Sequence, residues 1–135
     1  MTIDSIRKDE HVDLAEKQYQ AASQSDFQKM RFVHHSLPQM ATTDVSLASH
    51  LLGYDMPLPF YINGMTGGSD KTKVINQQLA EVAKASGLVM ASGSVSAAIK
   101  HPELSDSFKV IREVNPDGIV LANLGAHHTV ENAKR

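Results

Sequence analysis

The spacing of hydrophobic residues changes along the chain, from a helical pattern near the N-terminus to short continuous runs further on. Residues 4–22 are mostly polar, and Ile6, Val12, Ala15 and Tyr19 form one narrow apolar stripe. Such a stripe is typical of a helix that packs on one side only. We therefore predict an N-terminal helix whose outer face is exposed to water.

The region after this helix has no regular hydrophobic period. Residues 23–38 mix charged, aromatic and histidine positions, which predicts a loop or a short strand. Two apolar-leaning segments, residues 44–52 and 54–58, then flank Gly53. Because glycine permits a tight turn between strands, this arrangement predicts a short hairpin ahead of the main fold.

Three continuous apolar runs follow, at residues 60–63, 88–91 and 119–122. Helical patterns occupy the stretches between them, at residues 74–83 and 105–114. Strands separated by roughly thirty residues with a helix between them are typical of parallel βαβ units. The pattern thus predicts an α/β fold with a parallel sheet.

The end of the pattern and the number of strands indicate whether the chain is a whole domain or a fragment of a larger one. Gly87 stands where a helix C-cap belongs, and residues 129–135 resemble the first turns of another helix. Three parallel strands leave apolar edges, which a closed barrel of roughly 250 residues would remove, although an open doubly wound sheet would fit the present length. The pattern favours a fragment of a larger protein without requiring it.

Composition and charge narrow the class of protein. The 135 residues are 41% hydrophobic and 21% charged, and the formal net charge of -2 gives no preference for nucleic acid or anionic membranes. The absence of cysteine excludes disulfides, thiolate metal sites and cysteine nucleophiles. The N-terminus has no apolar signal core, and no stretch reaches the roughly 18 apolar residues of a membrane span. We expect a cytoplasmic protein that binds neither nucleic acid nor membranes.

Small or polar residues follow each predicted strand: Gly64, Met65 and Thr66 after the first, Ser94 after the second and Asn123 after the third. In parallel α/β folds this edge is where ligands bind. Uncharged hydrogen-bonding groups and a close backbone approach suit a flat heteroaromatic cofactor. The alternative is that the glycines after the strands serve only as tight turns and helix caps. Gly67 and Gly68, which follow Thr66, match neither a dinucleotide fingerprint nor a Walker A sequence.

A basic cluster near the N-terminus is a candidate anion site. On a helix, Arg7, Lys8 and His11 lie within one turn of each other. A bidentate arginine beside a lysine suits a compact, highly charged ligand such as a diphosphate. The alternative is a solvated charged helix face. The other histidines lack partners at metal-ligand spacing, so we expect no histidine metal site.

With these features in place, the chain resembles the type 2, FMN-dependent isopentenyl-diphosphate delta-isomerases over nearly its whole length. The ordered combination of six segments is specific, although any one alone would be weak. The segments are RKDEH at 7–11, FVHHSLP at 32–38, PFYINGMTGGS at 59–69, INQQLAEVA at 75–83, ASGSVSAA at 91–98 and NLG at 123–125.

The resemblance implies a TIM-type (β/α)8 barrel, of which this chain covers an N-terminal helix and hairpin extension and about the first three βα units. Residues 1–58 would be the extension, and residues 59–135 the first strands and helices of a single FMN-binding domain. The implied activity is the interconversion of isopentenyl and dimethylallyl diphosphate in isoprenoid biosynthesis, with reduced FMN, NADPH as reductant and Mg2+. The full-length protein would be a homo-oligomer, a tetramer or an octamer.

The resemblance also implies roles for individual residues. The implied flavin contacts are Gly64, Met65, Thr66, Ser94 and Asn123. The implied diphosphate contacts are Arg7, Lys8 and His11. No catalytic or metal-binding residue is expected within this chain, because those groups would lie beyond Arg135, so the chain alone would be inactive.

Two departures from the family pattern and two rival functions accompany this interpretation. Gly64 replaces a common alanine, and Ser96 stands where some members have an arginine, which puts one phosphate contact in doubt. The first rival is another FMN-barrel oxidoreductase, such as a hydroxy-acid oxidase or a relative of dihydroorotate dehydrogenase. The second is a non-enzymatic α/β module that binds a phosphate ligand.

Overall fold

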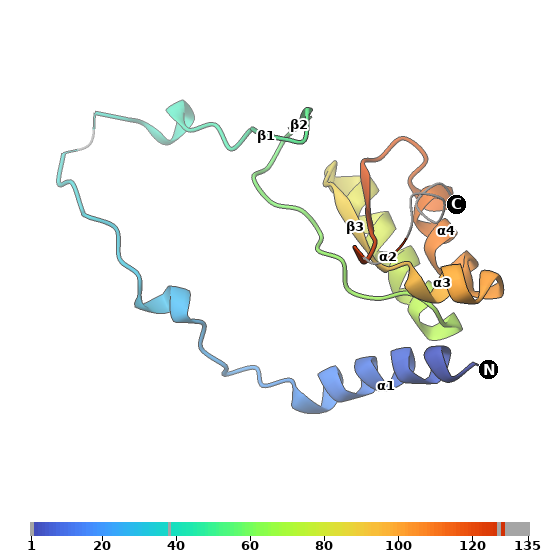
Figure 1. Ribbon diagram of the computed structural model, residues 1–135. Helices are drawn as coiled ribbons and strands as arrows, with labels where there is room; N and C mark the ends of the chain where they lie inside the picture. Colours follow the sequence, from blue (N-terminus) through green and yellow to red (C-terminus); the bar gives the residue numbers. More distant parts are fainter. Residues whose placement is uncertain (1, 38, 127, 129–135) are drawn as a thin grey trace.

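The computed structural model describes residues 2–37, 39–126 and 128 (Figure 1). The helix predicted at residues 129–135 lies outside these residues. The elements in chain order are α1 (Ile3–Gln18), the 3₁₀ turns η1 (Asp26–Lys29) and η2 (Thr42–Asp44), β1 (Ser49–Leu51), β2 (Tyr54–Met56), α2 (Asp70–Ser86), β3 (Met90–Ser94), α3 (Ser96–Lys100), the 3₁₀ turn η3 (Pro102–Leu104), α4 (Asp106–Val114) and β4 (Val120–Asn123).

The parallel βαβ unit predicted in the second half of the chain is present. β3 and β4 pair in parallel, with Met90 opposite Val120. The first predicted strand contributes a single parallel bridge between Ile62 and Met90. The Ile62 N–H donates to the Val89 carbonyl at 2.9 Å, and the Ala91 N–H donates to the Ile62 carbonyl at 2.8 Å. The three apolar runs therefore lie side by side, with β3 between Ile62 and β4.

The core lies where α2 and α4 pack behind these strands (Figure 1). Its buried members are Ala80 and Ala83 of α2, Met90 of β3, and Val110 and Ile111 of α4. The alanines allow close helix approach, while Met90 and Ile111, each 1% exposed, fill the space behind them. The predicted apolar face of α4 is thus the face that it buries. The predicted face of α2 is largely not buried, since Val74 and Val82 are each 55% exposed and the buried residues of α2 are Thr72, Asn76, Ala80 and Ala83.

The expectation of a (β/α)8 barrel is wrong for this structure. The described residues form two separate two-stranded sheets, β1 with β2 and β3 with β4. A barrel of this type closes through eight paired parallel strands. Here the parallel pair has one further backbone bridge, at Ile62, and β4 has no buried residue. What the described residues form is a small open α/β layer with helical and hairpin extensions.

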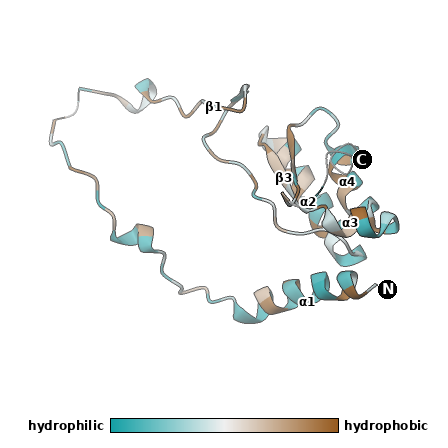
Figure 2. Ribbon diagram, in the orientation of Figure 1, coloured by the Kyte–Doolittle hydropathy of each residue, from teal (hydrophilic) through white to brown (hydrophobic). Residues whose placement is uncertain are grey.

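α1 begins at a side-chain cap, because the Thr2 hydroxyl accepts a hydrogen bond from the Ser5 N–H at 3.1 Å. It ends at Gln18, four residues before the predicted end. The described residues that follow, 19–37 and 39–48, hold the turns η1 and η2 and loop away from the body (Figure 1). Figure 2 shows apolar positions along this segment, of which Phe32 is fully exposed. The segment therefore joins α1 to the rest of the chain without forming part of the core.

The predicted hairpin is confirmed, with Leu51 paired to Tyr54 across a two-residue turn. The turn residues, Leu52 and Gly53, have φ angles of 52° and 87°. Positive φ at both central positions suits the twist of a two-residue hairpin, and glycine adopts it without strain.

In the described parts of the chain, no helix is both long enough and apolar enough to cross a membrane.

Candidate functional site

The segment after the first apolar run lies directly against the end of β3. The Gly93 N–H donates to the Thr66 carbonyl at 3.2 Å. A Cβ at Gly93 would overlap this carbonyl, and a Cβ at Gly64 would overlap the carbonyl of Ser92. Both glycines are therefore required for the close backbone approach. At Gly64 the neighbouring backbone already occupies the space that a side chain would take.

A buried polar network fixes the turn that follows. The Asn76 side chain, 1% exposed, donates to the carbonyls of Thr66 at 3.2 Å and Ser107 at 2.8 Å. The Gly68 N–H donates to the Ser107 hydroxyl at 2.8 Å. Ser69 caps α2, since its hydroxyl accepts from the Thr72 N–H at 3.1 Å. Because these buried groups are mutually satisfied, the turn has a defined position at the start of α2.

α1 lies across the first turns of α2 through two carboxylates (Figure 1). The Ser69 hydroxyl donates to Asp9 Oδ1 at 2.5 Å, and Lys71 Nζ lies 2.5 Å from Asp13 Oδ1. The hydrogen bond from Lys71 and then its charge hold the pKa of Asp13 below its usual value of 3.8. The hydrogen bond to Asp13 raises the pKa of Lys71 above its usual value of 10.5. Both groups are therefore charged near neutral pH.

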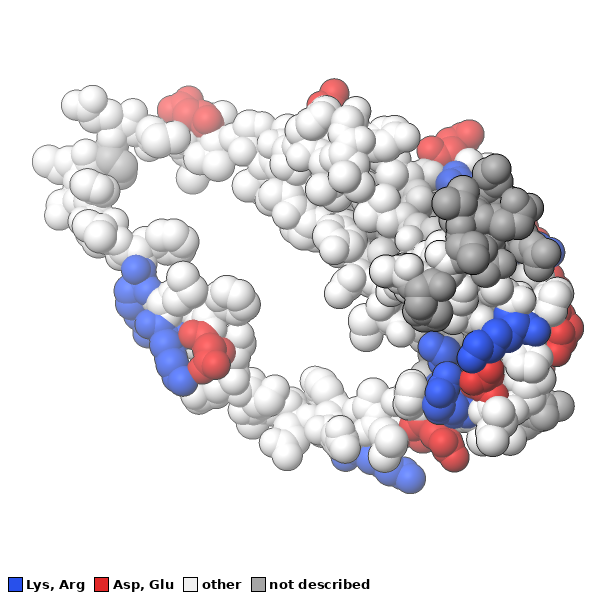
Figure 3. Space-filling model, in the orientation of Figure 1, with Lys and Arg blue, Asp and Glu red and all other residues white. Residues whose placement is uncertain are grey.

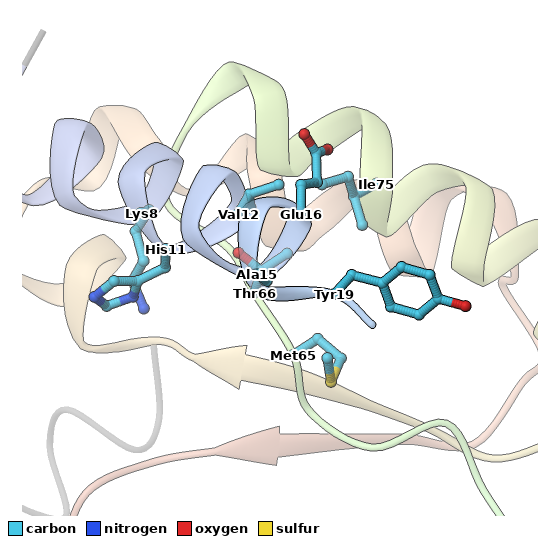
Figure 4. Close-up of a pocket in the computed structure, with 9 residues that line it drawn as sticks. All are labelled: Lys8, His11, Val12, Ala15, Glu16, Tyr19, Met65, Thr66 and Ile75. Carbon is cyan, nitrogen blue, oxygen red and sulfur yellow. The ribbon is translucent and has the colours of Figure 1, made fainter. Parts of the chain in front are cut away.

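A cleft of about 490 Å³ lies between α1, the segment before α2 and α2 itself. Figure 4 shows Lys8 and His11 at one end of this cleft and Tyr19 near the other, with Met65 facing them from the opposite wall. Most of its wall is apolar. The lining residues are Lys8, His11, Val12, Ala15, Glu16, Tyr19, Met65, Thr66 and Ile75.

Four of the residues predicted from the sequence meet in this cleft: Lys8, His11, Met65 and Thr66. Lys8 and His11 come from the predicted anion cluster, while Met65 and Thr66 come from the predicted cofactor edge. Met65 is 72% exposed, whereas Thr66 is 8% exposed. Arg7 does not line the cleft, because its guanidinium donates to Asp4 at 3.0 Å.

The remaining predicted positions lie at the ends of the strands and outside the cleft. Ser94 and Asn123 are register partners at the ends of β3 and β4. The Ser94 hydroxyl donates to Ser96 Oγ at 2.9 Å, and Ser96 Oγ lies 2.8 Å from His128 Nε2. Gly64 is packed against the end of β3, as described above. The structure therefore divides the predicted residues between a cleft and a neighbouring strand edge.

Sequence reasoning did not select five of the cleft residues as site residues. Three of them, Val12, Ala15 and Tyr19, belong to the apolar stripe predicted on α1. Because helix positions three and four apart share a face, the stripe and Lys8 together mark the cleft wall. The spacing could have identified them. Ile75 belongs to the helical apolar pattern predicted at residues 74–83, whereas Glu16 carried no comparable signal.

Charges of both signs gather where the N-terminal part of α1 meets the body of the molecule (Figure 3). This mixture agrees with the formal net charge of -2 and places cations locally rather than over a whole face. Among the described residues, no group of three or more His, Asp or Glu side chains could hold a metal ion. Within these residues, the cleft therefore offers side-chain cations and apolar surface.

No protein-family model matches the chain. Several curated proteins are similar to it, all named isopentenyl-diphosphate delta-isomerase. The protein of Latilactobacillus sakei is 54% identical over 134 residues, which are 99% of this chain and 38% of that protein. The protein of Staphylococcus haemolyticus is 49% identical over 94% of this chain and 36% of its own length. The protein of Streptomyces sp. is 48% identical over 96% of this chain and 36% of its own length.

The chain thus spans little more than a third of the length of these relatives. Their names state the isomerase activity and give neither a type nor a flavin. The assignment to the FMN-dependent type 2 class therefore does not stand and is corrected to the broader name. Along nearly all of its own length, the chain is similar to part of proteins named isopentenyl-diphosphate delta-isomerase.

Proposed function

We propose that this chain contributes the diphosphate end of the substrate site in an isopentenyl-diphosphate isomerase. The observation that carries the proposal is the cleft, in which Lys8 and His11 stand at one end of a largely apolar wall. A short branched alkenyl diphosphate has the same division, with a compact anion at one end and a hydrocarbon at the other. The names of the similar proteins support this substrate class.

Each end of the cleft has a separate task in this proposal. The Lys8 ammonium attracts the diphosphate, and the His11 ring adds a hydrogen-bond donor. Val12, Ala15 and Ile75 exclude water from the hydrocarbon. Isomerisation adds a proton to the terminal methylene carbon and removes one from C2, so the hydrocarbon must be held away from bulk water while these two steps occur.

Arg7 has a different place in the proposal from the one expected from the sequence. Its guanidinium is committed to Asp4, and its side chain is 60% exposed. In this arrangement it does not clamp the diphosphate. A direct contact would require Arg7 to leave Asp4.

The cofactors expected from the sequence, reduced FMN with NADPH and Mg2+, form part of the proposal. Met65, Ser94 and Asn123 fit one edge of a planar heteroaromatic ring, because Met65 and Asn123 are exposed and Ser94 and Asn123 end the paired strands β3 and β4. Gly64 fits less well, since backbone fills its open side. When bound, reduced flavin would supply the proton-transfer chemistry. A diphosphate-bound Mg2+ would need no cage of protein carboxylates.

The test is calorimetric titration of inorganic pyrophosphate into the full chain and into Lys8→Gln. Removing a charge-assisted contact should weaken binding about tenfold or more. Lys17→Gln is the matched control, since Lys17 is exposed on the same helix and outside the cleft. Equal affinities for the two variants would reject the site. Titration of isopentenyl diphosphate then measures what the apolar wall adds.

Binding of pyrophosphate and isopentenyl diphosphate with equal affinity would favour the phosphate-binding module over the isomerase. Conversion of isopentenyl to dimethylallyl diphosphate, followed by proton NMR with reduced FMN and Mg2+, is the activity test. It is applied to the full chain and to a longer protein that carries it. Activity that is lost in Lys8→Gln and kept in Lys17→Gln would support the proposal.

A further inference from the structure

α1 is held to the rest of the protein with little apolar contact. Ser5, at 6% exposure, is its one buried residue. The larger apolar side chains of the helix remain in water, since Ile3 is 83% exposed and Leu14 is 49% exposed. Hydrophobic burial, which drives most helix docking, is therefore a minor part of this interface.

Two carboxylates of α1, those of Asp9 and Asp13, make polar contacts to α2 and its cap instead. Asp9 accepts a hydrogen bond from the Ser69 hydroxyl, which caps α2, so its charge lies at the positive end of the α2 dipole. Asp13 pairs with Lys71, one turn further along α1. A third contact lies towards the start of α1, where Asp4 Oδ2 is 3.5 Å from His101 Nε2.

The spacing of the two carboxylates fixes the rotation of α1 as well as its position. Residues four apart lie on the same face of a helix, so Asp9 and Asp13 turn one face towards α2. Lys8 and Val12, each one residue earlier, then face the cleft. A rotation of α1 that broke the carboxylate contacts would carry the cleft residues away from Met65 and Thr66.

We propose that Asp9 and Asp13 are positioning residues that form a polar latch, which docks α1 onto α2 and thereby places Lys8 and His11 at the cleft. The ligand half of this inference rests on the proposed function, and the docking half does not. Because both contacts are polar and Asp13 is exposed, the latch opens more easily than a hydrophobic interface. The cleft wall formed by α1 is then detachable.

The docking half is tested by the distance between spin labels on α1 and α2. The chain contains no cysteine, so Gln18→Cys and Gln78→Cys give one label on each helix, both at exposed positions. The parent pair should give one narrow distance distribution. Asp9→Asn with Asp13→Asn should broaden it, because α1 then pivots about its contact at Asp4. An unchanged narrow distribution would overturn the latch.

Glu10→Gln is the matched control, because Glu10 is an exposed carboxylate on the same helix. It should leave the distribution narrow. Exchanging the partners, Asp13→Lys with Lys71→Asp, restores an ion pair of reversed polarity and should recover part of the narrowing. Broadening by Glu10→Gln equal to that of the double variant would attribute the effect to net charge and reject the latch.

The ligand half is tested by the affinity for inorganic pyrophosphate. Removing carboxylates alone makes the protein less negative and should strengthen anion binding. Lost positioning acts in the opposite direction, since apparent affinity falls in proportion to the docked fraction, about tenfold if about one tenth remains docked. Weaker binding in the double variant supports the inference, and tighter binding rejects the positioning role. If the parent binds no pyrophosphate, the proposed function fails, while the label distances still decide the latch.

Discussion

The Gly93 N–H donates to the carbonyl of Thr66 at 3.2 Å, at a place where a Cβ on residue 93 would overlap that same carbonyl. Gly93→Ala should therefore push the Thr66 segment off β3. The expected loss is about 1–3 kcal/mol of unfolding free energy, as for other overpacked sites. Urea denaturation of the full chain measures it.

Gly53→Ala provides the comparison for this variant. Gly53 has a φ of 87° with nothing within 4 Å of an added Cβ, so it tests backbone strain without a clash. Gly93 has no such positive φ, so it tests the clash without the strain. Gly53→Ala should leave pyrophosphate binding unchanged. If Gly93→Ala binds pyrophosphate as well as the parent, the close approach does not support the cleft.

The Asn76 side chain donates to two backbone carbonyls, one in the segment before α2 and one in α4. Replacing it with alanine removes both donors and leaves the carbonyls of Thr66 and Ser107 with fewer partners at a buried site. The expected loss of unfolding free energy is about 1–3 kcal/mol. Gln77→Ala, at an exposed position next to it, should stay within about 0.5 kcal/mol of the parent. Equal midpoints in urea for the two variants would contradict the network.

Gly67 combines strain with a clash. Its φ is 156°, and an added Cβ would overlap the ring of Phe108. Gly67→Ala should cost about 1–3 kcal/mol from the backbone alone and more from the ring. Adding Phe108→Ala should remove the part that comes from the ring, so the two changes should be non-additive in a double-mutant cycle. Strict additivity would show that the ring moves aside freely.

The ion pair between Asp13 and Lys71 predicts how docking of α1 depends on pH. The lowered pKa of Asp13 means that its contribution is present above the usual value of 3.8 and is lost as pH falls through the lower folded value. The raised pKa of Lys71 means that its contribution is present below 10.5 and is lost as pH rises through the higher folded value. The part of docking that this ion pair contributes should therefore be constant from about pH 5 to about pH 9, which the label distances measure.

Further charges surround this pair: Lys17 faces Asp13, while Asp9 and Glu16 face Lys71. Salt should act where pH does not, because the screening length falls to about 3 Å at 1 M. The distance distribution should broaden as salt is raised at constant pH. A distribution that is stable in high salt would indicate apolar docking instead.

Local chemistry accounts for the elements that could be predicted from the sequence. Gly87 ends α2 in the left-handed conformation, with φ of 67°, as expected of a C-cap glycine. The turn at Leu52 and Gly53 forms the expected hairpin. α4 and the parallel pairing of the apolar runs followed from continuous apolar stretches separated by a helical period. In each case, the residues that form the sequence pattern are the residues that form the element, or lie within a few positions of it.

Contacts between distant residues account for what could not be predicted. Residues 60–63 read as a full strand, but only Ile62 makes a ladder bridge, because the chain then bends along the end of β3. α3 has five residues, too few to show a period. Arg7 turns to Asp4, a partner that spacing alone does not select from several carboxylates. The binding roles of Lys8 and His11 stay predictions.

The chain that follows Gln18 joins α1 covalently to the rest of the protein, so docking of α1 at the cleft is an intramolecular binding step. A covalent tether supplies an effective concentration of up to about millimolar, so weak polar contacts suffice to keep the helix docked. The same helix supplied as a separate peptide would need about that concentration to fill the vacant wall of a chain that lacks it. Any partner that shortens, stiffens or captures the tether would thus control the cleft without contacting a lining residue.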